Sequence, residues 1–237
     1  EAGNLTPLPR KNIDTGMGLE RLSSVVQRVR SDFETDLFKP IIDRACQISG
    51  VAYGSSPQGD LAVRVISDHI RAAAFMVADG VLPSNEGPGY VLRRLIRRTI
   101  RFGRLLGIDR PFLLEVLPVV EQVMGGHYGE LVEHRSTINQ VLELEESRFL
   151  RTLEQGSALL EEEVRRVRSR GLSVFPGEVA FELYDTYGFP LELTSEMCQE
   201  QGLSVDIEAF ERAMERQREL ARSGSKHASA AVTRTVY

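Results

Sequence analysis

Apolar residues recur at spacings of three and four along most of the chain, which is the periodicity of amphipathic helices. Alternation typical of a strand is confined to the stretch before Asp14. The pattern therefore predicts a mainly α fold, a multi-helix domain with a short β segment at the N-terminus. The predicted helices cover residues 19–30, 35–48, 61–78, a segment that follows the loop 83–89, 112–124, 130–170, 177–184, 190–201 and 206–222. Asp206 is the expected cap of the last one.

The longest helical pattern runs from Glu130 to Arg170 and mixes acidic and basic residues. At 1.5 Å per residue it would span about 60 Å, which is long for a globular helix. Gly156 is a candidate break in it. We interpret this segment as a solvated strut or an antiparallel helix pair and assign it no chemistry.

Composition indicates an ordinary globular protein. The 237 residues are 42% hydrophobic, enough to bury the core of one or two domains. The chain contains no run of about 18 apolar residues that would predict a membrane span, so we expect no membrane partner. Cys46 and Cys198 lie far apart in apolar helical patterns, which favours buried thiols in a reducing compartment, and hence the cytoplasm. Because no methionine begins the chain, we expect a piece of a longer protein.

Charge is unevenly distributed. The net charge is −5, yet six arginines and no acid lie between Gly87 and Ile108. Such a basic stripe is typical of contact with a phosphate backbone, because counterion release depends on local charges. The alternative is a surface balanced by acids on neighbouring helices. The arginines are Arg93, Arg94, Arg97, Arg98, Arg101 and Arg104.

The loop before the arginines favours the nucleic-acid interpretation. Asn85 is a residue type that hydrogen-bonds base edges. Gly87 and Gly89 would allow a ligand to approach the backbone closely. We therefore expect Asn85 to read a base while the arginines set the register.

A second candidate site is the octet Asp14-Thr15-Gly16-Met17-Gly18-Leu19-Glu20-Arg21 at the start of a predicted helix. Gly16 and Gly18 lack a Cβ, so a flat base or sugar could lie against this backbone. The guanidinium of Arg21 can pair with phosphate oxygens near the positive end of the helix dipole. A turn before a helix is the simpler alternative.

The run from Leu183 to Pro190 holds three aromatic residues and one acid. Asp185 can accept a hydrogen bond from the exocyclic amine of guanine in the shallow minor groove of an RNA helix. The alternative is a structural turn held by Phe189. His69, inside an apolar helix, is interpreted as a hydrogen-bonded packing residue.

Metal and nucleophile chemistry have little support. Four histidines and two cysteines show no zinc-ligand spacing, so no metal site is predicted. No serine lies in a Gly-x-Ser-x-Gly turn, so a hydrolytic triad is not predicted either.

Together these segments resemble the alanyl-tRNA synthetases, a family of class II aminoacyl-tRNA synthetases. The octet is similar to the third class II motif in its alanine-specific form. The resemblance extends from about residue 4 to residue 222. The other matching segments are Asp68-His69-Ile70-Arg71, Asp79 to Glu86, Gly89 to Arg94 and Leu183 to Pro190.

The resemblance implies a role for each candidate residue. Arg21 would act catalytically by holding the ATP phosphates, Asp14 would bind the amino group of alanine, and Gly16 and Gly18 would line the adenylate pocket. Asn85 and Asp185 would read a G·U wobble pair in the acceptor stem of tRNA(Ala). The stem itself would be held by Arg93, Arg94, Arg97, Arg98 and Arg101. The full-length enzyme would use alanine, ATP and Mg²⁺.

The resemblance also implies four regions. Residues 1–30 would end the aminoacylation domain, 31–128 and 129–224 would form two tRNA-recognition subdomains, and 225–237 would be a linker. Class II motifs 1 and 2 and the zinc-binding editing domain are not matched. We therefore expect the chain alone to bind tRNA without forming alanyl-adenylate.

Two other functions stay open at this point. One is a free-standing helical RNA-binding module descended from a synthetase. The other is a helical scaffold whose arginine face pairs with acidic protein partners.

Overall fold

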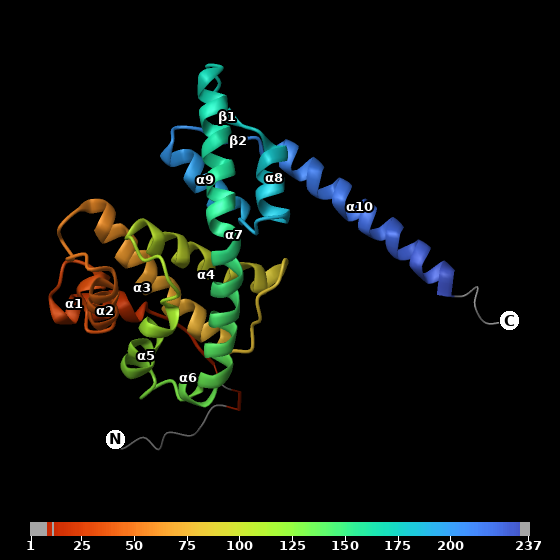
Figure 1. Cartoon of the computed structure of the whole chain (residues 1–237). Helices are drawn as coiled ribbons and strands as arrows, with labels where there is room; N and C mark the ends of the chain where they lie inside the picture. Colours follow the sequence, from red (N-terminus) through yellow and green to blue (C-terminus); the bar gives the residue numbers. More distant parts are fainter. Residues whose placement is uncertain (1–8, 11, 233–237) are drawn as a thin grey trace, which may run out of the picture.

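The computed structural model describes residues 9–10 and 12–232, which are mainly helical (Figure 1). The fold class predicted from periodicity is therefore confirmed. A short 3₁₀ turn, Asp32–Glu34, lies between the first two helices. The helices are α1 (Leu19–Gln27), α2 (Lys39–Ser49), α3 (Pro57–Ala78), α4 (Gly87–Leu105), α5 (Leu113–Met124), α6 (Glu130–Glu133), α7 (Arg135–Ser169), α8 (Gly177–Asp185), α9 (Leu191–Glu200) and α10 (Ile207–Val232).

The described residues contain one small parallel sheet, which the sequence pattern did not predict. Strand β1 (Val174–Phe175) pairs with β2 (Ser204–Val205), Val174 opposite Ser204. Strands of two residues are too short to show alternation. The β segment expected before Asp14 lies mostly in residues 1–8 and 11, outside the described residues, and residues 12–18 form neither helix nor strand.

Some helix boundaries differ from the predicted ones for local reasons. Helix α3 begins at Pro57 rather than Leu61, because the Ser56 hydroxyl accepts the Gly59 amide at 3.1 Å and caps the helix there. Helix α1 ends at Gln27, three residues early. Arg28 there adopts the left-handed conformation, which terminates the helix.

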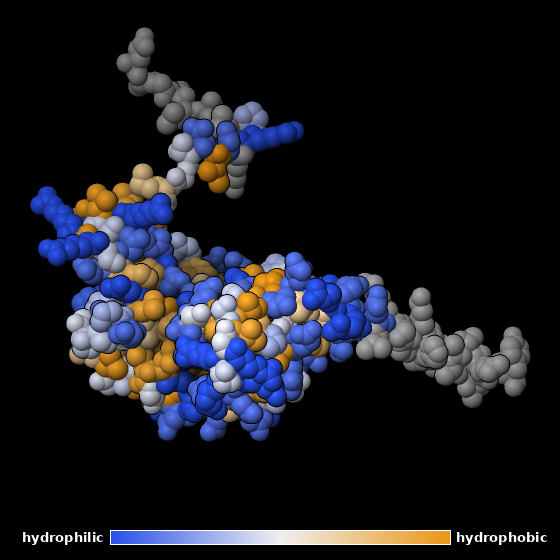
Figure 2. All heavy atoms as spheres, turned by 90° about the horizontal axis from the view of Figure 1, so that it is seen from above, coloured by the Kyte–Doolittle hydropathy of each residue, from blue (hydrophilic) through white to orange (hydrophobic). Residues whose placement is uncertain are grey.

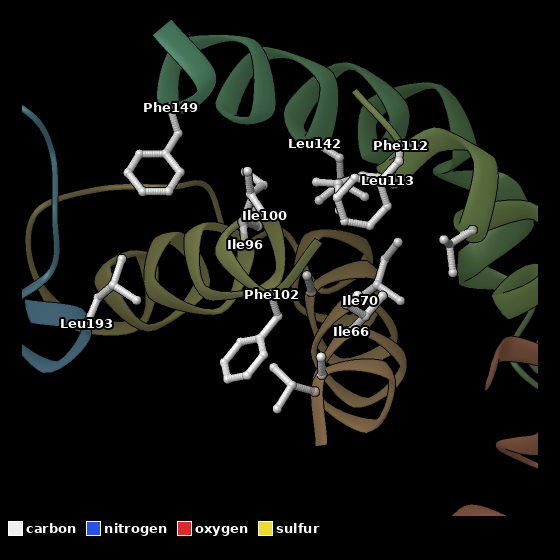
Figure 3. Packing of buried hydrophobic residues seen from close by; sticks show 14 of the residues in the cluster. Ile66, Ile70, Ile96, Ile100, Phe102, Phe112, Leu113, Leu142, Phe149 and Leu193 are labelled. Atoms are coloured by element: carbon white, nitrogen blue, oxygen red, sulfur yellow. The ribbon is translucent and has the colours of Figure 1, made fainter. Parts of the chain in front are cut away.

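The first half of the molecule is built around α3 and α4, which pack along each other. Ile66 and Ile70 of α3 belong to the same core cluster as Ile96 and Ile100 of α4, and all four are almost completely buried. Figure 3 shows side chains of α5 and α7, including Leu113 and Leu142, closing this core from the opposite side. The arginines of α4 are thus carried by a helix whose other face is fixed in the core.

Helix α7 joins the two halves. It packs on α3, α4 and α5 with its first turns and on α8 and β1 with its last (Figure 1). Gly156 does not break it: the Phe189 ring lies directly against this glycine, where any Cβ would collide. The predicted strut is therefore one helix of 35 residues, about 52 Å long.

The second half consists of α8, α9, the small sheet and the start of α10. Asp206 caps α10 as expected, since its Oδ1 accepts the Ala209 amide at 2.9 Å. Phe210 then packs edge-to-face on Tyr184 of α8. Further along, α10 extends away from the other helices, and it continues to Val232, past residue 225 where the linker was predicted to begin (Figure 1).

The outer surface is mixed in polarity. In the view of Figure 2, hydrophilic side chains dominate, and hydrophobic ones show between them. Within the described part of the chain, no helix is both long enough and apolar enough to cross a membrane.

Candidate nucleic-acid interface

Half of the six arginines of α4 are paired with glutamates of α9. Three ion pairs form a ladder between the two helices, each about one turn from the next. They are Arg94–Glu192 at 2.8 Å, Arg98–Glu196 at 2.6 Å, and Arg101–Glu200. The repeat arises because acids at 192, 196 and 200 follow the same helical period as the bases.

This pairing is the alternative of a basic stripe balanced by acids on a neighbouring helix. Arg101 is only 5% exposed, so it does not lie on an open basic face as expected. Arg104 is exposed and has no ion-pair partner within residues 9–10 and 12–219. Contact of Arg94, Arg98 and Arg101 with phosphate therefore stays a prediction.

A pocket of about 260 Å³ lies where α4, α7 and the α8–α9 turn meet. Three separate stretches of sequence line it, and both predicted base-reading residues are among them. The lining residues are Asn85, Tyr90, Arg93, Arg97, Arg148, Thr152, Tyr184, Asp185, Thr186, Tyr187, Gly188 and Pro190. We call this the recognition pocket.

Asn85 and Asp185 are 100 positions apart in the sequence and face the same pocket. Both side chains are exposed. Arg93 donates a hydrogen bond to the Asn85 Oδ1, which leaves the amide NH₂ of Asn85 free to donate. Asp185 has no hydrogen-bond or ion-pair partner for its side chain in the described part of the chain, so its carboxylate is open to a ligand donor.

Beneath the pocket lies Glu145, a buried carboxylate on α7 that is 3% exposed. Its Oε2 is 3.2 Å from Arg97 Nη2 and 3.6 Å from Arg93 Nε, and its Oε1 is 3.9 Å from Arg148 Nη1. Burial lowers the pKa of Arg97, although the Glu145 charge opposes this effect. Three guanidiniums around one carboxylate leave the pocket floor net positive.

The turn after Asp185 is fixed by contacts from two helices. Arg97 Nη1 donates to the Gly188 carbonyl, and Thr152 Oγ1 donates to the Tyr187 carbonyl at 2.8 Å. Phe189 is fully buried and packs edge-to-face on Phe149. The structural interpretation of this run and its proposed ligand role are compatible, because Phe189 anchors the turn while Asp185 stays exposed.

Three tyrosines line the pocket: Tyr90, Tyr184 and Tyr187. The Tyr90 hydroxyl donates to a Glu192 carboxylate oxygen. Burial raises the pKa of both Tyr90 and Tyr184, so both phenols stay protonated at neutral pH. Their hydroxyls are therefore neutral hydrogen-bonding groups beside a positive floor.

Gly89 serves the fold instead of a ligand. A Cβ at this position would lie 2.3 Å from both the Leu82 carbonyl oxygen and the Ser84 hydroxyl. The close approach predicted for Gly89 thus occurs against the chain's own loop. This packing sets the path of residues 82–86 and so the position of Asn85.

The octet lies apart from the recognition pocket. Asp14, Gly16, Gly18 and Arg21 are all exposed, and none of them lines the recognition pocket. The segment is attached through Glu20, whose Oε1 is 2.6 Å from Arg71 Nη2 on α3. The structure therefore does not bring the predicted ATP-binding and tRNA-binding residues together.

His69 is the hydrogen-bonded packing residue that the sequence predicted. Its Nδ1 lies 3.0 Å from Asp68 Oδ2, and its Nε2 lies 2.7 Å from Arg98 Nη1. This contact connects α3 to the ion-pair ladder. Among the described residues, no group of three or more His, Cys, Asp or Glu side chains could hold a metal ion.

Sequence reasoning gave no role to several residues in or beneath the pocket, among them Tyr90, Arg148 and Glu145. Tyr90 lies in a matched motif but was given no role. Arg148 and Glu145 lie in the long charged helix, where they resemble any solvated pair. Nothing local distinguishes a buried glutamate in such a pattern, because its burial depends on which helix packs against it.

Comparison with known proteins identifies the family of this chain. Residues 1–236 match the family described as tRNA synthetases class II (A). The chain is 57% identical over 221 residues to the alanine–tRNA ligase of Geobacillus thermodenitrificans, covering 93% of this chain and 25% of that protein. It is 53% identical over 226 residues to the enzyme of Halalkalibacterium halodurans, with 95% and 26% covered.

A third relative, the alanine–tRNA ligase of Bacillus subtilis, is 51% identical over 221 residues, with 93% of this chain and 25% of that protein covered. The chain thus spans about a quarter of the length of the curated relatives it matches. Because the family match covers almost the whole chain, this protein belongs to the class II (A) tRNA synthetases.

Proposed function

We propose that this chain is the tRNA-recognising part of an alanine–tRNA ligase. In that enzyme, alanine and ATP form alanyl-adenylate, and the alanyl group passes to tRNA(Ala). The observation that carries the proposal is the convergence of Asn85 and Asp185 on one pocket from distant parts of the sequence. The proposed compartment is the cytoplasm.

The pocket chemistry suits a G·U wobble pair. In such a pair the guanine 2-amino group has no partner on the opposite base, whereas in G·C it is bonded. A-form RNA displays this group in a wide, shallow minor groove. The unpartnered carboxylate of Asp185 is an acceptor for it, and the free NH₂ of Asn85 can donate to a neighbouring base or sugar oxygen.

Binding of the RNA backbone draws on the positive floor. Arg148 is the most accessible of the three guanidiniums, with 54% of its side chain exposed. It is placed to meet a phosphate near the pocket. Arg93, Arg94, Arg97, Arg98 and Arg101 would support the stem more indirectly, since each already has a partner in the chain.

Class II tRNA synthetases generally use ATP and Mg²⁺. The octet shows no enclosed surface that would hold them, since Asp14, Gly16, Gly18 and Arg21 are exposed. We therefore assign no step with ATP or Mg²⁺ to these residues alone, and we expect no ATP–pyrophosphate exchange by this chain. Their roles as phosphate, alanine and adenylate contacts stay proposals for the whole enzyme.

The decisive test is binding of two acceptor-stem RNA hairpins that differ only in a G·U or G·C pair. We expect the chain to prefer the G·U hairpin, with binding that weakens as salt rises. Asp185→Ala or Asn85→Ala should each reduce that preference by about 1 to 3 kcal/mol, the range for a good base-edge contact. Asp109→Ala, an exposed aspartate outside the pocket, is the control.

Equal binding of both hairpins by the unaltered chain would contradict G·U reading. Absence of any salt-dependent RNA binding would instead favour the helical scaffold. The ion-pair ladder bears equally on both readings, because Arg94, Arg98 and Arg101 are occupied by glutamates of α9. The hairpin titration therefore decides between them.

A further inference from the structure

One buried carboxylate connects the two base-reading positions of the recognition pocket. From Glu145, one path runs through Arg93 to the Asn85 side chain. A second runs through Arg97 to the carbonyl of Gly188, in the turn that follows Asp185. Glu145 itself does not line the pocket.

We propose that Glu145 is a positioning residue for base recognition, which orients Asn85 through Arg93 and the Asp185 turn through Arg97. This inference rests on the proposed function and deepens it, because it assigns the source of the pocket's geometry. The ligand class is unchanged: a base pair whose minor-groove edge presents an unpaired amine.

The first path matters because an asparagine amide can flip. Its oxygen and nitrogen differ little in size, so an exposed Asn85 alone could present either group to a ligand. A guanidinium only donates, so Arg93 selects the orientation in which Oδ1 faces inward and the NH₂ faces outward. Besides a long contact of 3.5 Å from its Nη2 to the Pro83 carbonyl, Arg93 is held from below by the charge of Glu145.

The second path holds the α8–α9 turn in place against α4. Arg97 reaches from α4 to the Gly188 carbonyl and is almost enclosed, with 12% of its side chain exposed. Without Glu145, Arg93 and Arg97 would be two like charges one helical turn apart in a desolvated site, which repel. Both would move toward solvent, so Asn85 and the turn would lose their restraints together.

A purely structural role predicts something different. A buried ion pair can be removed with a general loss of stability and no change in ligand preference. Glu196, whose side chain is 25% exposed, provides the control. It pairs with Arg98 of α4, and among the described residues it has no hydrogen bond or ion pair with Arg93, Arg97 or the pocket lining. Positioning affects preference between ligands, whereas support of the fold affects the melting temperature.

The experiment measures binding of the G·U and G·C hairpins by the whole 237-residue chain and its variants, with a thermal melt of each. We expect Glu145→Gln to lower the G·U over G·C preference by about tenfold, within the range for a lost base-edge contact. Glu196→Gln should lower the melting temperature but change the preference by less than about twofold, since no base contact is affected.

A double variant tests the path through Asn85. Because Glu145 acts partly on Asn85, the loss of preference in Asn85→Ala/Glu145→Gln should be smaller than the product of the two single losses. Independent, multiplicative losses would overturn this path. A folded Glu145→Gln variant with unaltered preference would overturn the whole proposal.

Two further results are distinguishable. If Glu145→Gln does not fold, Arg93→Gln breaks the same link nearer the surface, and it must lower the preference for the proposal to stand. If the unaltered chain shows no preference at all, the proposed G·U reading itself fails, and the positioning role fails with it. If Asn85→Ala lowers the preference but neither Glu145→Gln nor Arg93→Gln does, the positioning role fails while the proposed G·U reading stands.

Discussion

The octet and the recognition pocket both contain residues that resemble family motifs, but they are built in opposite ways. The octet is eight consecutive residues, all near the surface, and none of its four predicted ligand contacts is enclosed. The pocket draws on three stretches between Asn85 and Pro190, and the ion cluster of its floor is centred on the buried Glu145. A contiguous motif is easy to detect in a sequence, whereas the pocket exists only once distant stretches of the chain are packed together.

The difference lies in what holds each region. Helix α1 has no buried residue, and its tertiary attachments include Glu20 with Arg71 and Gln27 with Asp36. Around the pocket, Phe149, Phe189 and Leu193 are buried to within 1% of full enclosure. Side chains set on such a core are preorganised, whereas the exposed side chains of the octet would need further packed residues around them to be held in one position.

The largest expected effect is on stability, and it compares an apolar side chain beside the pocket with one on the helix that carries the octet. Phe189→Ala removes a fully buried ring that packs on Phe149 and Gly156, so it should destabilise the chain by about 3 to 5 kcal/mol. Val25→Ala, at 75% exposure on α1, should change stability by less than about 0.5 kcal/mol. Denaturant unfolding of both variants measures the contrast. A similar cost at the two positions would show that α1 is packed more firmly than its exposure indicates.

The second prediction concerns Glu146, the neighbour of Glu145. Its carboxylate accepts the Phe112 and Leu113 amides and caps α5, but burial raises its pKa from an ordinary 4.5 to about 7. The folded state then binds the proton more tightly than the unfolded state. The resulting stability is fully present below pH 4.5 and is lost as pH rises through 7.

Glu146→Gln keeps the acceptor and removes this titration. Relative to the unaltered chain, the variant should gain about 3 kcal/mol of stability between pH 4.5 and pH 8, from the free energy of the pKa shift. Urea unfolding at both pH values measures the gain, and Glu154→Gln, an exposed glutamate on the same helix, corrects for net charge. A constant difference between variant and parent across this range would refute the raised pKa. In the octet the shift has the opposite direction, because a backbone hydrogen bond lowers the pKa of Glu20.

The smallest expected effect is on RNA affinity, and it compares an arginine of the pocket with an arginine of the octet. Arg148→Ala should weaken both hairpins alike and reduce the salt slope by about one phosphate contact, since a phosphate contact carries no sequence information. Arg21→Ala, in the octet, should leave hairpin affinity unchanged. Titrations at several salt concentrations measure both. Loss of affinity in the Arg21 variant would mean that the stem reaches the octet.

Sequence reasoning was strong where a signal is local. The three-four period predicted the helices, Asp206 was identified as a cap, and His69 was identified as a packing residue. Reasoning was weaker where a residue's environment comes from a distant helix. Gly156 reads as a helix break until Phe189 is seen against it.

The sequence by itself determined the mainly helical fold, the family and the identity of the base-reading candidates, because periodicity and motifs are properties of neighbouring residues. Tertiary structure alone decided that most of the α4 arginines face glutamates, that Glu145 is buried beneath them, and that Asn85 and Asp185 share a pocket. The physical reason is that charge pairing and burial depend on which helix faces which. That choice is made by packing of the whole core rather than by any local segment.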